Sequence, residues 1–416
     1  MRFLILSHFY APETIPKPHE LAVGLIQKGH EVNVVTGIPN YPHGKFYPGY
    51  HLRPWQWEVR DGVRILRVPV VPDHSTSPVR RMLNYLSFRA ASSLLGPLGA
   101  GKADAMYVWH PPLTVGVSAW VIGLMRRIPF VYGVHDLWPE AVEATGMLTN
   151  QRMLGWMGKL ERFVYRQASS VAVISPGYKK NLEGKGVPPE KVHVITDWAN
   201  ESIYRPVDPD GALSEQMGMY GRFNVMFGGN MGPSQALGTV IEAAKRLANV
   251  PEIQFVFAGD GMEQPRLESM VQEKGLTNVR FLGRQPAETM PHLYANSEVL
   301  LAHFRKDPLF EISVPGKLFA YLACQRPVLM ASKGDAADMV NEAGAGVTCA
   351  AEDPTALAEA VMKLYHMTPE QRQNLGMAGR QAFQQKYSRE ILLRRHEELL
   401  IQAANRKTSA VPAAKL

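Results

Sequence analysis

Short apolar runs alternate along the chain with longer segments whose apolar residues recur every three or four positions. The first pattern is typical of buried parallel strands and the second of helices that cover a sheet, so the alternation predicts an α/β fold. In the first half we expect strands over residues 2–6, 31–35, 63–67, 105–109, 129–134, 171–174 and 192–195. In the second half we expect them over residues 223–228, 253–258, 279–282, 298–302, 327–330 and 346–349.

The alternation breaks once. Residues 200–221 mix proline, glycine, aspartate and serine without clear periodicity, which is typical of a linker. We therefore expect an N-terminal domain over residues 1–199 and a C-terminal domain over residues 222–387, each built on a doubly wound parallel, Rossmann-like sheet. A helix is expected over residues 388–404, packed back on the N-terminal domain, with a flexible tail over residues 405–416.

The composition narrows the class of protein. With 416 residues, 46% of them hydrophobic, the chain is long enough for two cores. Its two cysteines, Cys324 and Cys349, lie in apolar stretches and form no CxxC motif, so a reducing cytoplasm is expected. The N-terminal apolar run is too short for a signal peptide, and no run reaches the roughly 20 residues of a membrane span. The formal net charge is +7, but no basic run with interleaved aromatics occurs, so nucleic acid is not an expected partner.

Ligands of open parallel sheets bind beyond the carboxyl ends of the strands, so the turns after strands are the candidate sites. In FGGNMGPSQAL, Gly228, Gly229 and Gly232 let the backbone approach a ligand closely, and the next helix directs its N–H groups at an anion. A tight turn that needs glycine is an equal alternative. Gly259 follows the next strand in AGDGME, but Gln264 stands where GxGxxG needs its third glycine, which disfavours a Rossmann oxidoreductase.

Two polar residues follow a strand of the first half. His135 and Asp136, in GVHDLWPEAV, are well placed for function. The structural alternative is a packed histidine beside a helix-capping aspartate. The chain has no HExxH, GxSxG or P-loop motif, and its thirteen histidines show no metal-ligand spacing, so we expect no metal.

Lys317 is the least expected residue of the segment SVPGKLFAYLACQRPVL. Pro315 suits a helix start, and the apolar residues after Lys317 repeat at core spacing. A lysine in the first turn opposes the positive end of the helix dipole, where a carboxylate is more stable. The lysine therefore indicates an anionic ligand.

Seven motifs occur in order over nearly the whole chain: FYAPE, ELAVGLIQKGHEVNVVTGIPNYPHGKFYPGY, HDLWPEAV, VAVISPGYKKNLEGKGV, DWANESIYRP, FGGNMGPSQAL and VPGKLFAYLACQRPVL. In these motifs the chain resembles the GT-B fold glycosyltransferases of family 4, and among them the WbuB-like surface-polysaccharide transferases. The resemblance implies two Rossmann-like domains that face a central cleft. It also implies retaining, metal-independent transfer from a nucleotide diphosphate donor, expected to be a UDP-sugar with an N-acetylated amino sugar as one option, to a lipid-linked glycan of O-antigen, capsule or exopolysaccharide.

The same resemblance assigns roles to residues. The implied catalytic residues are His135, which reaches the donor sugar, Asp136 and Lys317. Lys317 and the loop over residues 228–232 hold the diphosphate, and Arg284 lies beside the nucleobase. The implied donor-binding set is Gly228, Gly229, Asn230, Met231, Gly232, Gly259, Arg284, Glu311, Pro315, Gly316 and Leu318. A phosphate oxygen of the donor helps to take the acceptor proton, so no pair of catalytic carboxylates is needed.

Some positions depart from the family pattern. Pro233, Ser234 and Gln235 stand where many members carry a cation, and Ala320 stands where many carry a ribose-binding glutamate. Glu311 is nearby, at a spacing one residue longer than usual. Restoring a glutamate at Ala320 is expected to tighten UDP binding. Two alternatives to a transferase stay open, a non-catalytic nucleotide-sugar-binding protein and a GT-B sugar-nucleotide epimerase.

The segment SPVRRMLNYLSFRAASSLLGPLG predicts a helix with an apolar face and a basic end. Its apolar residues at helical spacing are Met82, Leu83, Leu86, Ala90, Leu94 and Leu95, and its cations are Arg80, Arg81 and Arg89. An interfacial helix on the inner face of the cytoplasmic membrane fits this pattern, and would bring the enzyme to a lipid-linked acceptor. An ordinary core-facing helix with a solvated basic end fits it equally well.

Overall fold

The computed structural model describes residues 1–75, 77–144, 146 and 148–409. The chain forms two compact units. The first contains Met1–Ile174, Tyr178–Ile195 and the chain from Leu393 onward, and the second contains Ser175–Gly177 and Thr196–Leu392.

The first unit is built on an eight-stranded sheet in the order β3-β4-β2-β1-β5-β6-β7-β8. The strands are β1 (Arg2–Ser7), β2 (Glu31–Gly37), β3 (Gln56–Arg60), β4 (Val63–Val68), β5 (Ala105–His110), β6 (Phe130–Val134), β7 (Ser170–Val173) and β8 (Val192–Val194). All neighbours are parallel except β3 and β4, which are antiparallel. The sequence pattern missed β3 because this edge strand alternates half-buried and exposed residues, with Val59 71% exposed, and so lacks a continuous apolar run.

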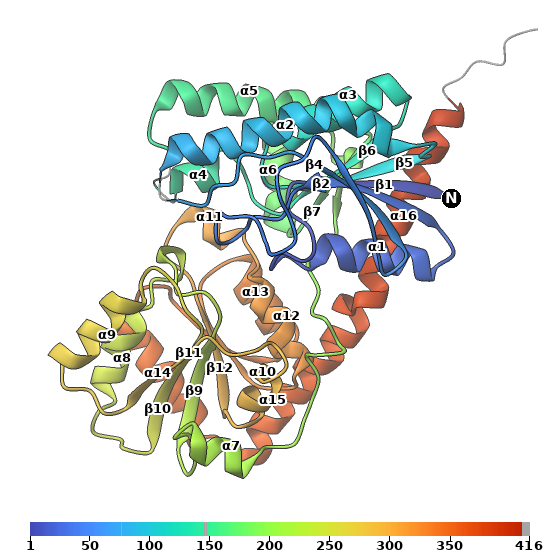
Figure 1. Cartoon of the computed structure of the whole chain (residues 1–416). Coiled ribbons are helices and arrows are strands. Elements are labelled where there is room, and N and C mark those ends of the chain that lie inside the picture. The colour runs from blue at the N-terminus through green and yellow to red at the C-terminus, as the bar shows by residue number, and fades with distance from the viewer. Residues whose placement is uncertain (76, 145, 147, 410–416) are drawn as a thin grey trace, which may run out of the picture. The chain divides into compact units, whose positions relative to one another are not determined.

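Helices cover both faces of this sheet. They are α1 (Lys17–Gln27), α2 (Pro78–Ala100), α3 (Val115–Arg126), α4 (Glu140–Ala144), α5 (Gln151–Gln167), α6 (Pro176–Gly184) and α16 (Arg389–Ser409). Figure 1 shows α2, α3 and α5 side by side over one face, with α1 on the other. From Leu393 onward α16 packs on this unit: Leu393 fills the space left by Gly24, and Glu397 pairs with Lys28 at 3.1 Å.

The second unit is built on a six-stranded sheet in the order β11-β10-β9-β12-β13-β14, with every pair parallel. The strands are β9 (Phe223–Gly228), β10 (Ile253–Ala258), β11 (Val279–Gly283), β12 (Val299–His303), β13 (Val328–Ala331) and β14 (Gly346–Cys349). Its helices are α7 (Gly211–Gln216), α8 (Gly238–Arg246), α9 (Gln264–Glu273), α10 (Met290–Ala295), α11 (Pro308–Glu311), α12 (Gly316–Ala323), α13 (Asp335–Glu342), α14 (Pro354–His366) and α15 (Pro369–Ala382).

Side chains of β9 alternate between two apolar cores. Val225 and Phe227 belong to the cluster under α8 and α14, and Met226 belongs to the cluster under α10 and α12. With both faces covered, the strand reads as a continuous apolar run, which is why the sequence predicts it correctly.

The segment 200–221 has more structure than a linker. It contains α7, whose first turn is capped by Asp210, and Leu213 and Met217 pack against the second core. Residues 196–221 therefore lie in the second unit, together with Ser175–Gly177. Polar cap and turn residues surround these few apolar contacts, and they hide the periodicity of a helix this short.

Candidate functional site

The carboxyl edge of the second sheet holds two glycine turns packed backbone against backbone. Gly229 follows β9 with a φ of 127°, and Gly259 follows β10 with a φ of 141°. A Cβ on Gly259 would collide with the carbonyl oxygen of Gly229, so any side chain there would push the turns apart. The Gly229 N–H donates to the Ala258 oxygen at 2.8 Å, and the Gly259 N–H donates to the Gly283 oxygen at 2.8 Å. Glycine is required here by space and by backbone conformation.

Lys317 contacts this glycine loop from the first turn of α12. Its Nζ lies 3.5 Å from the centre of the Phe227 ring and donates to Oε1 of Gln235 at 3.2 Å. A Cβ on Gly229 would lie 3.4 Å from Nζ. Lys317 is half-buried, and burial lowers its pKa well below its ordinary value with no carboxylate among the causes. The amine therefore lacks an anionic partner in the described residues and is placed to receive an anion at the loop.

His303 holds Gln235 in position, a role that the sequence did not reveal. It ends β12, is buried, and its Nδ1 lies 2.7 Å from the Gln235 carbonyl oxygen. The Glu352 N–H donates to its Nε2 at 3.4 Å, which assigns the ring hydrogen to Nδ1. Burial lowers the pKa of His303 to about 4, so the ring is neutral. The available signal was a histidine at the end of a strand next to β9, but that neighbour relation is tertiary.

The start of α12 is set by Pro315, whose extended conformation makes it the N-cap, so the helix begins at Gly316. Tyr321, one turn further, accepts a hydrogen bond from the Gly228 N–H at 2.9 Å and so ties α12 to the end of β9. Leu318 and Ala320 point into the core, with exposed fractions of 0% and 6%. The side chain of Leu318 is thus a packing residue, and a longer acidic side chain at Ala320 would be buried.

The remaining predicted donor residues differ in their surroundings. Asn230 is exposed at the tip of the glycine loop, whereas Met231 is buried and its N–H donates to the Asp260 oxygen at 2.7 Å. Arg284 is exposed and lies 3.7 Å from the Asp260 carboxylate, which links it to the second glycine turn. Glu311 is exposed at the end of α11, and no side-chain contact joins it to the loop in the described residues.

The first unit carries polar residues at the carboxyl edge of its own sheet. His135 follows β6 and stacks on Trp109 with ring centres 3.9 Å apart and planes 14° apart. Asp136, next in the chain, is exposed. His8 and His110 lie at the ends of the neighbouring strands β1 and β5, and burial lowers the pKa of each to about 3. The sequence indicated His135 but not the other two, because the adjacency of these strands is not local.

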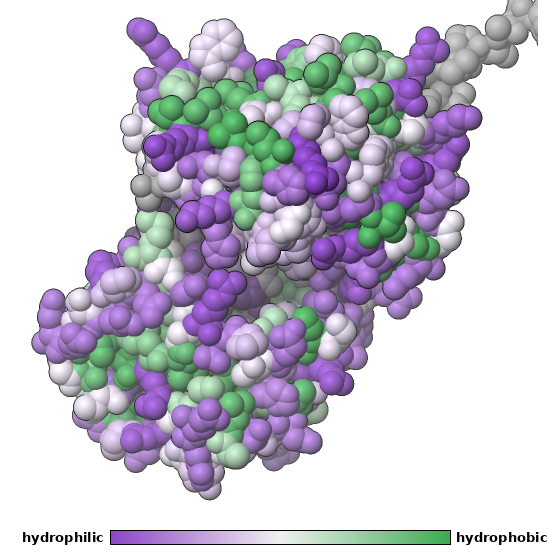
Figure 2. Space-filling model, viewed as in Figure 1, coloured by the Kyte–Doolittle hydropathy of each residue, from purple (hydrophilic) through white to green (hydrophobic). Residues whose placement is uncertain are grey.

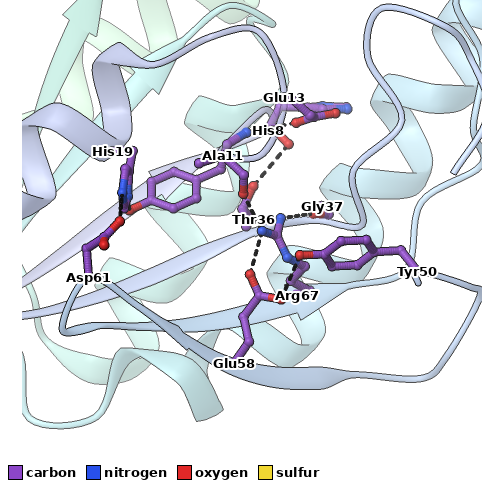
Figure 3. A network of polar contacts seen from close by, with 11 residues as sticks. His8, Ala11, Glu13, His19, Thr36, Gly37, Tyr50, Glu58, Asp61 and Arg67 are labelled. Atoms are coloured by element: carbon purple, nitrogen blue, oxygen red, sulfur yellow. Dashed lines mark hydrogen bonds and ion pairs between the residues drawn. The ribbon is translucent and has the colours of Figure 1, made fainter. Parts of the chain in front are cut away.

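A buried polar network shapes the segment after β1 (Figure 3). The Glu13 carboxylate accepts hydrogen bonds from the N–H groups of Tyr10, Asn40 and Tyr41 at 2.7–2.8 Å. Burial raises the pKa of Glu13, and the three N–H donors oppose that rise. Glu13 thus ties the segment after β1 to residues 40 and 41.

A second part of the network approaches the same segment from β4. Arg67 is fully buried, and its guanidinium donates to the Ala11 carbonyl, to the Gly37 oxygen at 3.1 Å and to Glu58 at 2.7 Å. A buried charge is tolerated when it is paired and hydrogen-bonded, and Arg67 meets both conditions. The network therefore supports the segment after β1 (Figure 3).

In the described residues, no group of three or more histidines, cysteines, aspartates and glutamates is placed to hold a metal ion. No described helix is both long enough and apolar enough to cross a membrane.

Comparison with known families identifies the chain. Residues 17–198 match the family model described as a glycosyl transferase 4-like domain, and residues 222–367 match the model described as glycosyl transferases group 1. The two matched domains together span most of the chain, which is a glycosyltransferase.

Relatives with curated names agree. The chain is 29% identical to the putative colanic acid biosynthesis glycosyl transferase WcaI of Escherichia coli, over 78% of this chain and 81% of that protein. It is 26% identical to the probable glycosyltransferase WbjE of Pseudomonas aeruginosa, over 62% of this chain and 65% of that protein. Both names refer to glycosyl transfer, and the WcaI name refers to colanic acid biosynthesis.

The fold is that of GT-B enzymes. HepE of Anabaena, solved with UDP and glucose, superposes with a TM-score of 0.72 at 18% identity, covering 96% of this chain and 99% of HepE. Sucrose-phosphate synthase of Thermosynechococcus elongatus superposes with a TM-score of 0.71 at 18% identity, covering 97% of this chain and 99% of that one. The predicted pair of Rossmann-like domains is confirmed.

Proposed function

We propose that the protein transfers a sugar, with retention of configuration and without a metal, from a UDP-sugar to a lipid-linked saccharide in surface polysaccharide assembly. The proposal of a UDP-sugar donor rests on Lys317, whose half-buried amine lies beside the glycine loop. Burial lowers the pKa of this amine, and no carboxylate is among the causes of the shift. A nucleotide diphosphate supplies the missing anion. The complex of HepE with UDP supports the same donor class in this fold.

The chemistry follows from where charge develops. As the bond to the sugar breaks, negative charge grows on the departing diphosphate, and fixed donors that already face it stabilise the transition state. Lys317 and the N–H groups at the start of α12 are such donors, and their dipoles need not reorganise. A donor phosphate oxygen takes the acceptor proton in this scheme, so the sugar is delivered on the face from which the diphosphate leaves.

The other assigned roles remain proposals that rest on the resemblance. His135 serves the donor sugar and Asp136 assists it, while Arg284 and Glu311 serve the nucleoside. The specific placement among WbuB-like transferases is likewise a proposal. It is supported by the motif set and by the colanic acid name of the WcaI relative.

The acceptor half rests on α2, whose exposed face carries large apolar side chains. Asn84 and Ser92 face inward, where the Asn84 amide donates to the Val71 oxygen at 2.7 Å and the Ser92 hydroxyl donates to Ser118 at 2.8 Å. The outward stripe is apolar, with Leu94 77% and Leu98 71% exposed. Figure 2 shows hydrophobic side chains gathered over α2. Exposing these apolar side chains to water is unfavourable, and we propose that the stripe contacts the inner face of the cytoplasmic membrane.

A transfer assay tests the proposed function. The protein is incubated with a panel of UDP- and GDP-sugars and a polyprenyl-diphosphate sugar acceptor, with and without EDTA, and nucleotide release is measured together with the anomeric configuration of the product. We expect UDP release that depends on the acceptor, persists in EDTA and gives a retained anomer. Activity abolished by EDTA would reject metal independence, and an inverted anomer would reject the front-face route.

Membrane attachment is tested separately by flotation with liposomes that contain anionic lipid. Replacing Arg80, Arg81 and Arg89 together by glutamate is expected to remove most of the binding, because each arginine near an anionic surface contributes about 1 kcal/mol. Raising the salt concentration is expected to weaken wild-type binding. Equal flotation of a folded triple variant would leave α2 as a structural helix.

A further inference from the structure

An apolar hollow of about 330 Å³ lies in the first unit among α2, α4 and α5. Its wall includes Leu83 and Tyr85 from α2, Trp138 and Val142 from the α4 region, and Met153 and Met157 from α5. In the described residues of the wall, Arg81 alone is charged. Protein interiors rarely leave a space of this size unfilled, and ~300 Å³ is the lower end of the range for ligand pockets.

The wall suits a flexible apolar ligand. Three of its residues, Met82, Met153 and Met157, are methionines. Methionine side chains are unbranched and polarisable, so they adapt to ligands of irregular shape. A hydrocarbon chain makes no hydrogen bonds, and this wall offers few. The hollow therefore fits a segment of alkyl or polyprenyl chain better than a sugar or a nucleotide.

The mouth of the hollow is continuous with the apolar stripe of α2. Val79 and Leu83 line the hollow and are 70% and 52% exposed, and Met153 on α5 is 46% exposed. Trp156, one turn along, is 71% exposed with the Lys159 Nζ 4.9 Å from its ring. Exposed tryptophan beside lysine is typical of side chains at a membrane surface.

The positive charge of Arg81 at the rim of the hollow favours a ligand with an anionic head group. Arg81 is half-buried, and its Nε–H donates to the Ser75 carbonyl at 2.6 Å, which fixes the direction of the guanidinium. Arg80 beside it is exposed. A guanidinium at the edge of an apolar hollow matches a phosphate attached to a hydrocarbon chain.

The inner wall leads to the carboxyl edge of the sheet. Tyr85 and Trp138 contact one another with ring centres 5.9 Å apart. Behind them, Tyr85 contacts His8 at 5.7 Å and Trp138 contacts His110 at 5.8 Å. These histidines end strands β1 and β5, next to the strand that His135 follows. A chain held in the hollow would therefore present its head group at the edge where an α/β sheet binds ligands.

We propose that this hollow binds the hydrocarbon chain of a lipid phosphate, with Arg81 at the phosphate, and so forms the lipid part of the acceptor site. The assignment rests on the proposed transfer to a lipid-linked acceptor and adds the place and the chemistry of lipid recognition.

The test uses 12-bromododecyl phosphate at concentrations below those at which it forms micelles. Its bromine quenches tryptophan fluorescence at contact. Trp138 in the wall is the reporter. We expect saturable quenching that disappears in Trp138→Phe and that an equal concentration of inorganic phosphate does not relieve. Quenching that rises linearly without saturation, or that persists in Trp138→Phe, would overturn the assignment.

A matched pair of variants on one helix separates the hollow from the membrane stripe. Leu83→Asp places a carboxylate at the mouth, whereas Leu94→Asp makes the same change at a residue outside the hollow that is also exposed. We expect the alkyl phosphate to bind at least tenfold more weakly to Leu83→Asp and less than twofold more weakly to Leu94→Asp. Equal effects of the two changes would overturn the assignment.

The head group is tested in the same way. Arg81→Gln is expected to weaken the alkyl phosphate several-fold and to leave the uncharged 12-bromododecanol unaffected, with Arg80→Gln as the control. Wild type should also bind the alcohol more weakly than the phosphate. Equal binding of phosphate and alcohol to wild type would overturn the role of Arg81.

Sugar transfer measured on the same proteins distinguishes a failure of the proposed lipid site from a failure of the proposed function. If wild type transfers sugar to the polyprenyl acceptor but Leu83→Asp and Leu94→Asp share one KM for it, the hollow is wrong and the proposed function stands. If the alkyl phosphate binds as expected but no lipid acceptor is used, the lipid site stands and the proposed acceptor class is wrong.

Discussion

Replacing Lys317 by methionine should make the enzyme more stable and far less active. Methionine keeps an unbranched stem of similar length and removes the ammonium. An ammonium taken out of water costs several kcal/mol, and because Lys317 is mostly buried we take its cost as about 4 kcal/mol. The contact with Gln235 returns about 2 kcal/mol and the Phe227 ring about 1 kcal/mol. The balance favours the variant by roughly 1 kcal/mol, which in a unit of this size raises Tm by about 2–4 °C.

Activity should change in the opposite direction. A donor aimed at the charge of the transition state contributes on the order of 3 kcal/mol, so turnover is expected to fall about 10²- to 10³-fold. Lys363→Met is the matched control, because Lys363 is an exposed lysine on α14 in the same unit. It should alter neither Tm nor turnover.

The pH dependence gives an independent signature. Because burial lowers the pKa of Lys317, the unfolded chain binds a proton in a pH range where the native chain does not. Stability from this residue therefore rises with pH up to its ordinary pKa of 10.5, and Lys317→Met should lose that slope. A bound diphosphate favours the charged form and raises the pKa of Lys317 again, so calorimetry in two buffers should show more proton uptake in wild type than in the variant. If Lys317→Met keeps the turnover or the proton uptake of wild type, Lys317 does not bind the diphosphate.

Four further outcomes are expected. Gly259→Ala should lower Tm and abolish UDP binding in calorimetry, because its Cβ collides with the Gly229 oxygen. Ala320→Glu should lower the free energy of unfolding in urea and leave UDP binding no tighter, because the new carboxylate would be buried. The free energy of unfolding of wild type should fall as pH drops from 6.5 toward 4, and His303→Gln should fall less steeply, because the unfolded chain protonates a histidine that the native chain keeps neutral. His135→Gln should reduce turnover at least tenfold in the transfer assay and change UDP affinity by less than twofold; normal turnover would remove His135 from the catalytic set.

Lys317 and the glycine turns could be predicted from the sequence because both concern local rules. Lys317 violates such a rule, and the glycine turns obey one. A cation in the first turn of a helix opposes the dipole, and that conflict is visible without any tertiary knowledge. Clustered glycines after an apolar run mark a turn that needs their conformations. The structure places both features in contact, with Nζ of Lys317 3.4 Å from where a Cβ on Gly229 would lie.

His303 and Gln235 could not be predicted, because their pairing depends on strand order. They are 68 residues apart and meet only because β12 lies next to β9 in the sheet. The sequence gives the strands in chain order, and the order in the sheet is a property of tertiary packing. The same reason hid His8 and His110 beside His135.

At Ala320 the resemblance and the structure lead to different predictions for UDP binding. Aligned with a family pattern, it marks a missing ribose-binding carboxylate, and restoring that group was expected to tighten UDP. The structure instead places Ala320 in the apolar cluster under α12, at 6% exposure. Helix spacing decides which face a residue occupies, and an acidic pair displaced by one residue no longer points both side chains the same way. The nucleoside contact is therefore better sought at the exposed residues Glu311 and Arg284.

The carboxyl edges of the two sheets differ in charge and in apolar surface, and this difference agrees with the substrates proposed for them. Both present turns at the carboxyl ends of parallel strands, the place where such sheets bind ligands. At the edge of the second sheet the principal side chain is the amine of Lys317, which has no carboxylate partner in the described residues and so suits an anionic diphosphate. At the first edge the buried histidines His8 and His110 are held neutral and adjoin an apolar hollow, so that edge offers little to a diphosphate and much to a chain of hydrocarbon. The proposed diphosphate donor and the proposed lipid acceptor therefore fit separate units, one by charge and the other by apolar burial.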